Sequence, residues 1–566
     1  MPNPDSRYGA MRTTRREALL LAATAGLGAA VSGAADALAG TQPSTQQAPG
    51  HCSTPKWAVA NTQYGRVRGY VDGGVLTFKG VPYGQNTGGD NRWLPAKPPA
   101  SWDGERPTLV YGANCPQFLH DFTAVEQSFL QQWVDGYFSE DMLKLNIWTP
   151  SLSGRRAVMF YIHGGGFSFG SSYELASQEG AQMARRHDVV QISVNHRLNG
   201  LGFLDLSEVG GAAYAESANV GMTDLVAALR WVRENIANFG GDPDNVMIYG
   251  QSGGGSKVTT LMGMPAATGL FHRSAVQSGG GGNPPSSEQA RALTRQVMVE
   301  LGLQPTDIES LRRIEWGTLN KAGNAAIAKL NPPAKGFGIG SPPDPNPRVG
   351  WAPILDGRSV TERAFFNAAP ARSKDIPLMI GSVSEEGNRM SSRPTREQWQ
   401  GSLARSLGEE KAQALIAVMI KAHPHKSIRT LSYAVGGIGQ RNNVQRLAAM
   451  QHALHGAPVY QYYFTWQSPM LEDAGAWHTA ELAFCFDNTE RCKQGTGNTP
   501  QAQALAAKMA QAWANFARTG NPSQPALAWT ATDPVRCQTM VFDDECRMVD
   551  DPEGDIRKIL LKGTGL

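Results

Sequence analysis

The sequence predicts an α/β protein with a large, mostly parallel central sheet, helices on both faces of that sheet and a small antiparallel edge near the N-terminus. The first observation is a series of short, near-continuous apolar runs, which are typical of parallel strands covered on both faces. The second is that helical patterns separate these runs. The third is a glycine-punctuated stretch over 61–81, which favours an antiparallel strand pair at the sheet's edge. The predicted buried strands are 157–162, 189–194, 246–249, 274–277, 377–380 and 459–464.

Two of the predicted helices have clear ends in the sequence. Apolar residues recur every three or four positions over 225–236, and Gly240-Gly241 follows as a stop signal. The same period recurs over 505–516, between Thr499-Pro500 and Gly520-Asn521-Pro522. Threonine before proline is a start signal and glycine before proline a stop signal, so this helix is predicted to begin and end there.

Residues 1–39 are typical of a twin-arginine export signal. Arg15-Arg16 precede an apolar run over 18–31, and Ala37-Leu38-Ala39 offers a cleavage site of small residues. A membrane anchor is the alternative, but the run is short and rich in alanine and glycine. We therefore expect a periplasmic or secreted bacterial protein with no stable membrane insertion once the signal is removed. The predicted segments after the signal are a flexible lead-in over 40–55 and a single domain over 56–566.

The charge of the chain does not favour a strongly charged partner. Lys and Arg number 52 and Asp and Glu number 49, so the net charge is +3 over 566 residues. This near balance disfavours a nucleic-acid-binding protein. No Cys-x-x-Cys or His-rich spacing indicates a metal site. Nothing in the sequence indicates an oligomeric state.

Six cysteines follow the export signal, and an even number of cysteines in an exported protein favours disulfides. They are Cys52, Cys115, Cys485, Cys492, Cys537 and Cys546. The short separations predict one bridge between Cys485 and Cys492 and another between Cys537 and Cys546. Cys52 and Cys115 are then left for each other. This connectivity is a hypothesis from spacing.

A candidate nucleophile follows the predicted strand at 246–249. The run Gly250-Gln251-Ser252-Gly253-Gly254 comes directly after that strand, and a potential helix over 256–262 follows. Strand, G-x-S-x-G and helix together are the context of a nucleophile elbow, in which a serine lies on a strained turn. Bulky residues at Gly250 and Gly254 would collide with the neighbouring strand and helix. An ordinary Gly/Ser turn is the alternative, and the strand and helix on either side disfavour it.

A glycine run follows another predicted strand and supplies candidate oxyanion donors. His163-Gly164-Gly165-Gly166-Phe167 follows the strand at 157–162, and an H-G-G-G run after an early strand forms half of an oxyanion hole. The predicted donors are the N–H groups of Gly165, Gly166 and Gly253. A phosphate-binding loop is the alternative, but no Lys-Ser/Thr follows as a P-loop requires. His163 is expected to shape the loop.

The order of a triad on this fold is serine, then an acid, then histidine. His478 lies in a loop beyond the last strong strand, where a triad histidine belongs. Glu385 and Glu386 follow the strand at 377–380, and a carboxylate there can orient a histidine. On spacing alone either glutamate could serve.

The chain resembles the type B carboxylesterases, the family that includes the cholinesterases and the bacterial p-nitrobenzyl esterases. The resemblance spans roughly residues 58–545 and is carried by many ordered motifs. They are the runs at 78–83, 114–117, 139–147, 163–167, 195–198, 228–232, 239–243, 271–274, 277–279 and 351–357. The family implies an α/β-hydrolase fold and hydrolysis of small-molecule carboxylic esters without a metal or organic cofactor.

Carried over by position, the family's nucleophile falls on Ser252 and its oxyanion donors on Gly165, Gly166 and Gly253. Its acid falls on Glu386 rather than Glu385, and its base on His478. Glu481, three residues after the histidine, is expected to be structural. The implied mechanism is acyl transfer through an acyl-enzyme on the serine.

The chain departs from the family at several positions. Gln251 and Gly253 flank the nucleophile where the family usually has Glu and Ala. Met142 stands where the family has a cysteine, so Cys115 lacks its usual partner. Amide or carbamate hydrolysis is the alternative within the fold, and a non-catalytic binding module is the alternative outside catalysis. The second loses support because all three triad positions are occupied.

Overall fold

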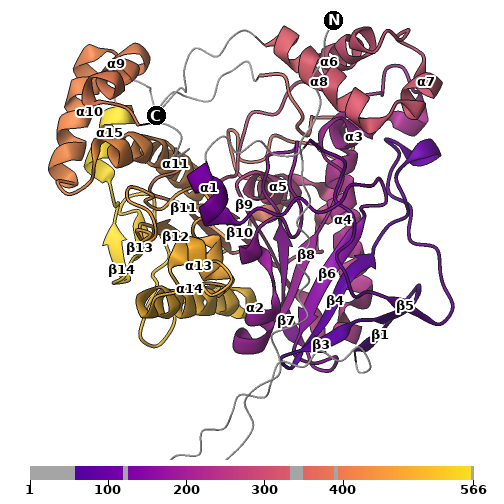
Figure 1. Ribbon diagram of the computed structural model, residues 1–566, viewed down its shortest axis with the longest axis horizontal. Helices are drawn as coiled ribbons and strands as arrows, with labels where there is room; N and C mark the ends of the chain where they lie inside the picture. The colour runs from indigo at the N-terminus through magenta and orange to yellow at the C-terminus, as the bar shows by residue number, and fades with distance from the viewer. Residues whose placement is uncertain (1–57, 119–124, 332–347, 388–392, 562–566) are drawn as a thin grey trace, which may run out of the picture. The chain divides into compact units, whose positions relative to one another are not determined.

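An eleven-stranded sheet runs through the computed structural model, which describes residues 58–118, 125–331, 348–387 and 393–561 (Figure 1). The strand order is β14-β13-β12-β11-β10-β9-β7-β8-β6-β4-β3. The strands are β3 (Tyr70–Asp72), β4 (Val75–Pro82), β6 (Lys144–Thr149), β7 (Arg156–Ile162), β8 (Val190–Val194), β9 (Gly241–Gln251), β10 (Arg273–Gln277), β11 (Leu378–Val383), β12 (Val459–Phe464), β13 (Gln538–Phe542) and β14 (Arg547–Asp550).

The centre of this sheet is parallel and its two edges are antiparallel. Strands β8, β7, β9, β10, β11, β12 and β13 pair in parallel, whereas β14 and the β6-β4-β3 side pair antiparallel. The six predicted buried strands coincide with β7 to β12, so the prediction of a mostly parallel sheet is confirmed. The stretch over 61–81 supplies the predicted antiparallel edge pair, β3 and β4, and also part of a second sheet. That smaller sheet contains β1 (Val59–Thr62), β2 (Gly65–Arg68) and β5 (Glu105–Pro107).

Helices cover both faces of the central sheet. Side chains alternate along a strand, so Val246 and Ile248 of β9 join one apolar core while Met247 and Tyr249 join the other. Helices α4 and α5 contribute to the first core, and α2, α12 and α14 to the second. A third cluster joins α9, α10, α11 and α15, which lie together in Figure 1.

The helices have the following bounds. They are α1 (Val125–Gln131), α2 (Ala181–His187), α3 (Asn199–Phe203), α4 (Val220–Asn235), α5 (Gly253–Gly263), α6 (Ser287–Glu300), α7 (Ile308–Arg313), α8 (Trp316–Leu330), α9 (Arg396–Leu407), α10 (Glu409–Ala422), α11 (Ile428–His452), α12 (Leu482–Cys485), α13 (Lys493–Thr496), α14 (Pro500–Thr519) and α15 (Gly554–Leu561). The predicted ends of α14 are confirmed: Thr499 caps it through the Ala502 N–H, and Gly520 ends it in the left-handed region.

The two short-range disulfides predicted from spacing are wrong. Cys485, Cys492, Cys537 and Cys546 are free thiols. The Cys485 thiol lies inside the sheet-facing core, where it contacts the Gln277 side chain at 3.6 Å. A short separation in sequence does not by itself give the Cα and Cβ geometry that a disulfide requires. The prediction for Cys115 stays untested because its proposed partner, Cys52, lies outside the described residues, as do the export signal and the 40–55 lead-in.

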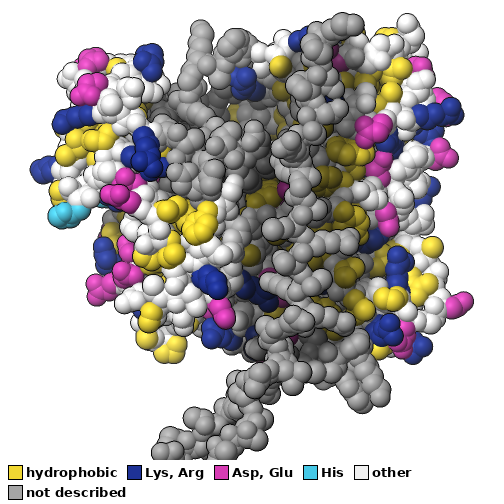
Figure 2. Space-filling model, in the orientation of Figure 1, with side chains coloured by type: hydrophobic (Ala, Val, Ile, Leu, Met, Phe, Trp, Pro, Cys, Tyr) yellow, Lys and Arg dark blue, Asp and Glu magenta, His cyan; other side chains and the backbone are white. Residues whose placement is uncertain are grey.

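The surface and the helices of the described part add two observations. On the face in Figure 2, basic and acidic side chains are interspersed among the described residues, in line with the near-zero net charge. In the described ranges, no helix is both long and apolar enough to cross a membrane.

Candidate active site

The candidate site lies at the carboxyl edge of the parallel strands. The register aligns Ile162 of β7 with Gly250 of β9, and Gln277 of β10 with both Gln251 and Gly381. The loops that follow β7, β9 and β11 therefore emerge side by side. In open α/β sheets this is the edge where ligands bind.

Ser252 lies on a strained turn between β9 and α5. Its backbone has φ 57° and ψ −124°, a conformation that costs a non-glycine residue free energy. The Ser252 N–H donates to the Gln277 carbonyl at 2.8 Å, which holds the turn against β10. A Cβ on Gly250 would lie 2.6 Å from the Ile162 oxygen, and one on Gly254 would lie 2.1 Å from it. The steric reason predicted for both glycines is confirmed.

The structure brings the glycine loop that carries two of the predicted oxyanion donors against the third, Gly253. Gly165 and Gly166 have φ of 76° and 61°, which glycine adopts readily. The backbones of Gly253 and Gly166 touch: a Cβ on Gly253 would lie 2.4 Å from the Gly166 nitrogen. The alanine usual in the family at this position would therefore collide with the glycine loop, so Gly253 permits a closer approach of the two donor segments.

The carbonyl groups of these peptides point away from the donors. The Gly165 carbonyl accepts from the N–H groups of Ser168 and Phe169, both at 3.2 Å, and the Ser252 carbonyl accepts from Ser256 at 3.2 Å. In a planar trans peptide the N–H points opposite to the C=O. The N–H groups of Gly166 and Gly253 thus face the other way, and within the described ranges neither donates to a protein acceptor.

Glu386 is the glutamate that the structure brings to His478. Its Oε2 contacts His478 Nδ1, and its Oε1 accepts from the Val383 N–H at 3.2 Å. Burial lowers the pKa of His478, but the charge and hydrogen bond of Glu386 and the charge of Glu481 outweigh this and raise it above its usual value. The pair can therefore hold a protonated imidazole.

Glu385 has a different set of contacts. Its carboxylate is fully buried and binds Lys426 Nζ at 2.6 Å, the Ala476 N–H at 2.8 Å and the Ser384 hydroxyl. Its own N–H donates to the Ala476 carbonyl at 3.1 Å. Glu385 thus ties the acid loop to the loop that carries His478. Spacing alone left either glutamate as the partner of His478, and the structure places Glu386 there. The contacts of Glu385 between the two loops were not predicted from the sequence.

The His478 ring contacts the Gln251 side chain. The Gln251 amide nitrogen lies 3.2 Å from His478 Nε2 and 3.4 Å from His478 Nδ1. Among the described residues, the Ser252 hydroxyl makes no hydrogen bond to this ring or to another group. Catalytic hydrogen bonds are often long without substrate and tighten when it binds.

Two buried groups surround this centre. Burial and the nearby charge of Glu386 raise the pKa of the Glu481 carboxyl to about 8, although His478 opposes the shift. Within the described part of the chain its Oε2 has no hydrogen-bond partner, and Oε1 lies 3.5 Å from the Ser278 hydroxyl. His163 is buried and stacks on His196 with ring centroids 5.1 Å apart. Burial keeps the pKa of His163 well below its usual value, so it is neutral and shapes the glycine loop.

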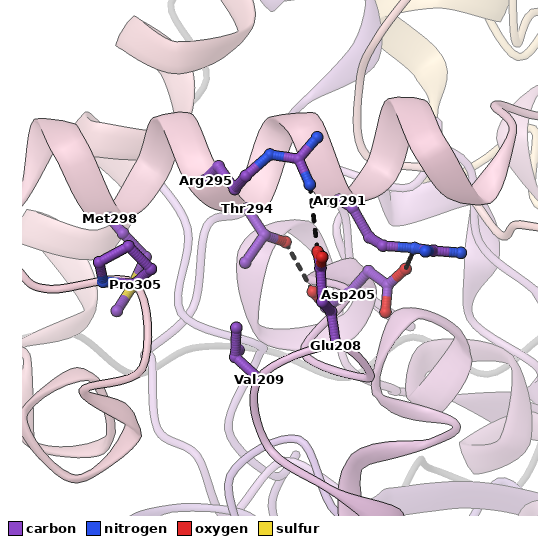
Figure 3. A pocket seen from close by; sticks show the side chains of 8 residues that line it. All are labelled: Asp205, Glu208, Val209, Arg291, Thr294, Arg295, Met298 and Pro305. Atoms are coloured by element: carbon purple, nitrogen blue, oxygen red, sulfur yellow. Dashed lines mark hydrogen bonds and ion pairs between the residues drawn. The ribbon is translucent and has the colours of Figure 1, made fainter.

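A small pocket elsewhere on the molecule is separate from this centre. It is lined by Asp205, Glu208, Val209, Arg291, Thr294, Arg295, Met298 and Pro305 (Figure 3). Arg295 pairs with Glu208 at 3.1 Å, and Thr294 donates to the Asp205 carbonyl at 2.8 Å. The pocket holds none of the candidate catalytic residues. Among the described residues, no cluster of three or more potential metal ligands occurs.

Comparisons with known proteins agree on one family. The profile of the carboxylesterase family matches residues 56–553. The para-nitrobenzyl esterase of Bacillus subtilis (strain 168) is 30% identical over 511 residues, which cover 90% of this chain and 99% of that protein. The phenmedipham hydrolase of Pseudarthrobacter oxydans is 32% identical over 506 residues, covering 86% and 95%. A solved esterase from Clostridium hathewayi, whose description says that it can hydrolyze aliphatic aromatic polyesters, matches with a TM-score of 0.76 at 33% identity, covering 89% and 98%.

Proposed function

The chain belongs to the carboxylesterase family of α/β-hydrolases and is a carboxylic ester hydrolase, and we propose that it acts through an acyl-enzyme on Ser252 with Glu386 and His478. The observation that carries the proposal is the contact between Glu386 and His478 beside a serine on a strained elbow. The three clustered glycines supply N–H donors where the negative charge of an ester reaction develops.

The proposed reaction runs in two steps. His478 Nε2 takes the proton of the Ser252 hydroxyl as its oxygen attacks the ester carbonyl carbon. The carbonyl oxygen becomes an oxyanion held by the N–H groups of Gly165, Gly166 and Gly253. His478 then gives the proton to the departing alcohol. Water, deprotonated by the same nitrogen, attacks the acyl-enzyme and releases the acid, and Glu386 stabilises the imidazolium that forms in each step.

Small-molecule esters are the proposed substrates. One relative is named a para-nitrobenzyl esterase and another a phenmedipham hydrolase, which supports a small-molecule substrate. With matched p-nitrophenyl esters and p-nitroanilides, we expect the enzyme to show a higher kcat/KM on the esters. A higher kcat/KM on the anilides would assign amide hydrolysis instead.

Labelling tests the proposed nucleophile directly. A fluorophosphonate probe is expected to modify the purified protein once, on the peptide that contains Ser252, and to abolish hydrolysis of p-nitrophenyl butyrate in proportion. Peptide mass mapping identifies the labelled residue. Full hydrolysis by a completely labelled protein, or labelling of another residue with loss of activity, would reject the proposal.

Export is proposed from the N-terminal segment alone. Arg15-Arg16 and the apolar run after them support twin-arginine transport to the periplasm or the exterior. Expression in a bacterial host with and without a functional twin-arginine pathway separates this from a cytoplasmic protein.

Gln251→Glu is expected to move the pH profile of activity. A carboxylate placed beside His478 Nε2 favours the protonated imidazole and raises the pKa of His478. The base acts only when neutral, so the acidic limb of kcat/KM is expected to shift upward by about one pH unit. Profiles with p-nitrophenyl butyrate from pH 5 to 9 measure the shift. Gln251→Met, which adds no charge, serves as the control. If the acidic limb of kcat/KM had the same midpoint pH in both variants, the expectation would be contradicted.

A further inference from the structure

A buried lysine contacts the loop that carries the oxyanion donors. Lys257 lies in α5, five residues after Ser252, and its side chain is completely buried. Its Nζ donates to the His163 carbonyl at 3.0 Å and to the Gly164 carbonyl at 3.2 Å. The ammonium also lies 5.7 Å from the centre of the Phe167 ring at the end of the same loop. Lys257 takes no part in the proposed acyl-transfer steps.

The bond from Lys257 to Gly164 helps to determine where the Gly165 N–H points, and His163 Nδ1 lies 3.1 Å from the same carbonyl. The Gly164 carbonyl and the Gly165 N–H belong to one planar trans peptide, so they point in opposite directions. With the carbonyl directed at Lys257 Nζ, the N–H is directed away from that ammonium. An ammonium on the carbonyl oxygen also draws electron density from the peptide, which makes its N–H a stronger donor.

We propose that Lys257 is the positioning residue of the oxyanion hole, which orients and polarises the Gly165 N–H through the Gly164 carbonyl. The other two donor peptides have neutral partners on their carbonyls, namely the N–H groups of Ser168, Phe169 and Ser256. Gly165 is therefore the donor whose peptide carries a cation. The inference deepens the proposed function and rests on it.

The charge of Lys257 has a counterpart in the same buried region. Glu174 attracts it, and the Glu174 carboxylate is itself fixed by the Ser171 N–H at 2.7 Å and the Gln178 amide at 3.3 Å. Burial lowers the pKa of Lys257 to about 7 and raises that of Glu174 to about 7, and each group opposes the shift of the other. His163 and His196, which face the same space, are held neutral by burial.

Two substitutions separate orientation from charge. Lys257→Met removes both, and Lys257→Gln keeps a donor but no charge. For p-nitrophenyl butyrate we expect kcat to fall about 10- to 100-fold in the Met variant and less in the Gln variant, with KM changed less than about threefold. Lys321→Met, the same change on an exposed position of α8, serves as the control and is expected to keep full activity.

A transition-state analogue distinguishes this role from a structural one. The carbonyl carbon of a trifluoromethyl ketone bonds to the serine oxygen, and its oxyanion occupies the same hole. Its Ki is expected to rise in Lys257→Met by the factor by which kcat/KM falls. Full kcat in a folded Met variant, or an unchanged Ki beside a reduced kcat/KM, would overturn the inference. If the Met variant does not fold, the same two outcomes in the Gln variant decide. A different result would reject the proposed function itself, namely ester hydrolysis that is retained in Ser252→Ala.

Discussion

Ser252→Ala is expected to lower kcat for p-nitrophenyl butyrate by about 10⁴- to 10⁶-fold, with little change in thermal stability. The hydroxyl oxygen is the only atom lost, and without it no acyl-enzyme can form. The Ser252 hydroxyl makes no hydrogen bond to another described residue, so its removal leaves none of those groups without a partner. Alanine meets the same backbone strain at φ 57° as serine does. Steady-state kinetics and a melting curve on the purified variant measure both effects.

The neighbouring serine of α5 provides the control for this substitution. Ser256 lies one turn after Ser252, and its backbone N–H, which a side-chain change leaves in place, donates to the Ser252 carbonyl. Ser256→Ala is expected to keep activity within about twofold. Retention of more than about a hundredth of wild-type turnover by Ser252→Ala would show that another group is the nucleophile, because residual catalysis without the serine is far smaller.

The second large effect is expected for Glu386→Gln, which should lower kcat by about 10³- to 10⁴-fold. The amide is close in shape to the carboxylate but cannot stabilise the positive imidazolium of His478, and it can hold the ring in the wrong tautomer. Because the carboxylate raises the pKa of His478, the acidic limb of the remaining activity is expected to move to lower pH. Kinetics over pH 5 to 9 measure both changes.

The adjacent glutamate is the matched control, and its expected effect is on stability. Glu385→Gln removes the ion pair with Lys426 and weakens the tie to the Ala476 N–H. The Lys426 side chain is 21% exposed and can turn to water, so the free energy of unfolding is expected to fall by about 1–3 kcal/mol. Denaturant melts measure this loss. A larger fall of kcat in folded Glu385→Gln than in Glu386→Gln would assign the acid to Glu385.

Much of the fold followed from patterns that are local in the chain. Strands β7 to β12 were predictable because buried parallel strands leave near-continuous apolar runs, and α14 because its caps are adjacent to its apolar stripe. The second small sheet was not predictable, since the partner of β2 on one side, β5, lies about forty residues away and is fully exposed. A pairing of that kind leaves no periodic signal.

The elbow and the glycine loop could also be predicted from the sequence, because each combines a strand, a turn and a specific glycine at fixed spacing. The buried role of Lys257 had a weaker signal that was missed. Lys257 lies four residues before Leu261, on the apolar face of α5, where an unpaired charge would be costly. A lysine in that position indicates acceptors nearby, but not which carbonyls they are.

The strands before the serine and the glutamates, and the glycines around the nucleophile, could be predicted from the sequence, since each depends on residues close together in the chain. Only the tertiary structure decided that Glu386 reaches His478 while Glu385 binds Lys426, and that Gln251 contacts the histidine. Each depends on the direction of a side chain across loops separated by tens to hundreds of residues. Packing of the whole sheet determines those directions, and no local pattern records them.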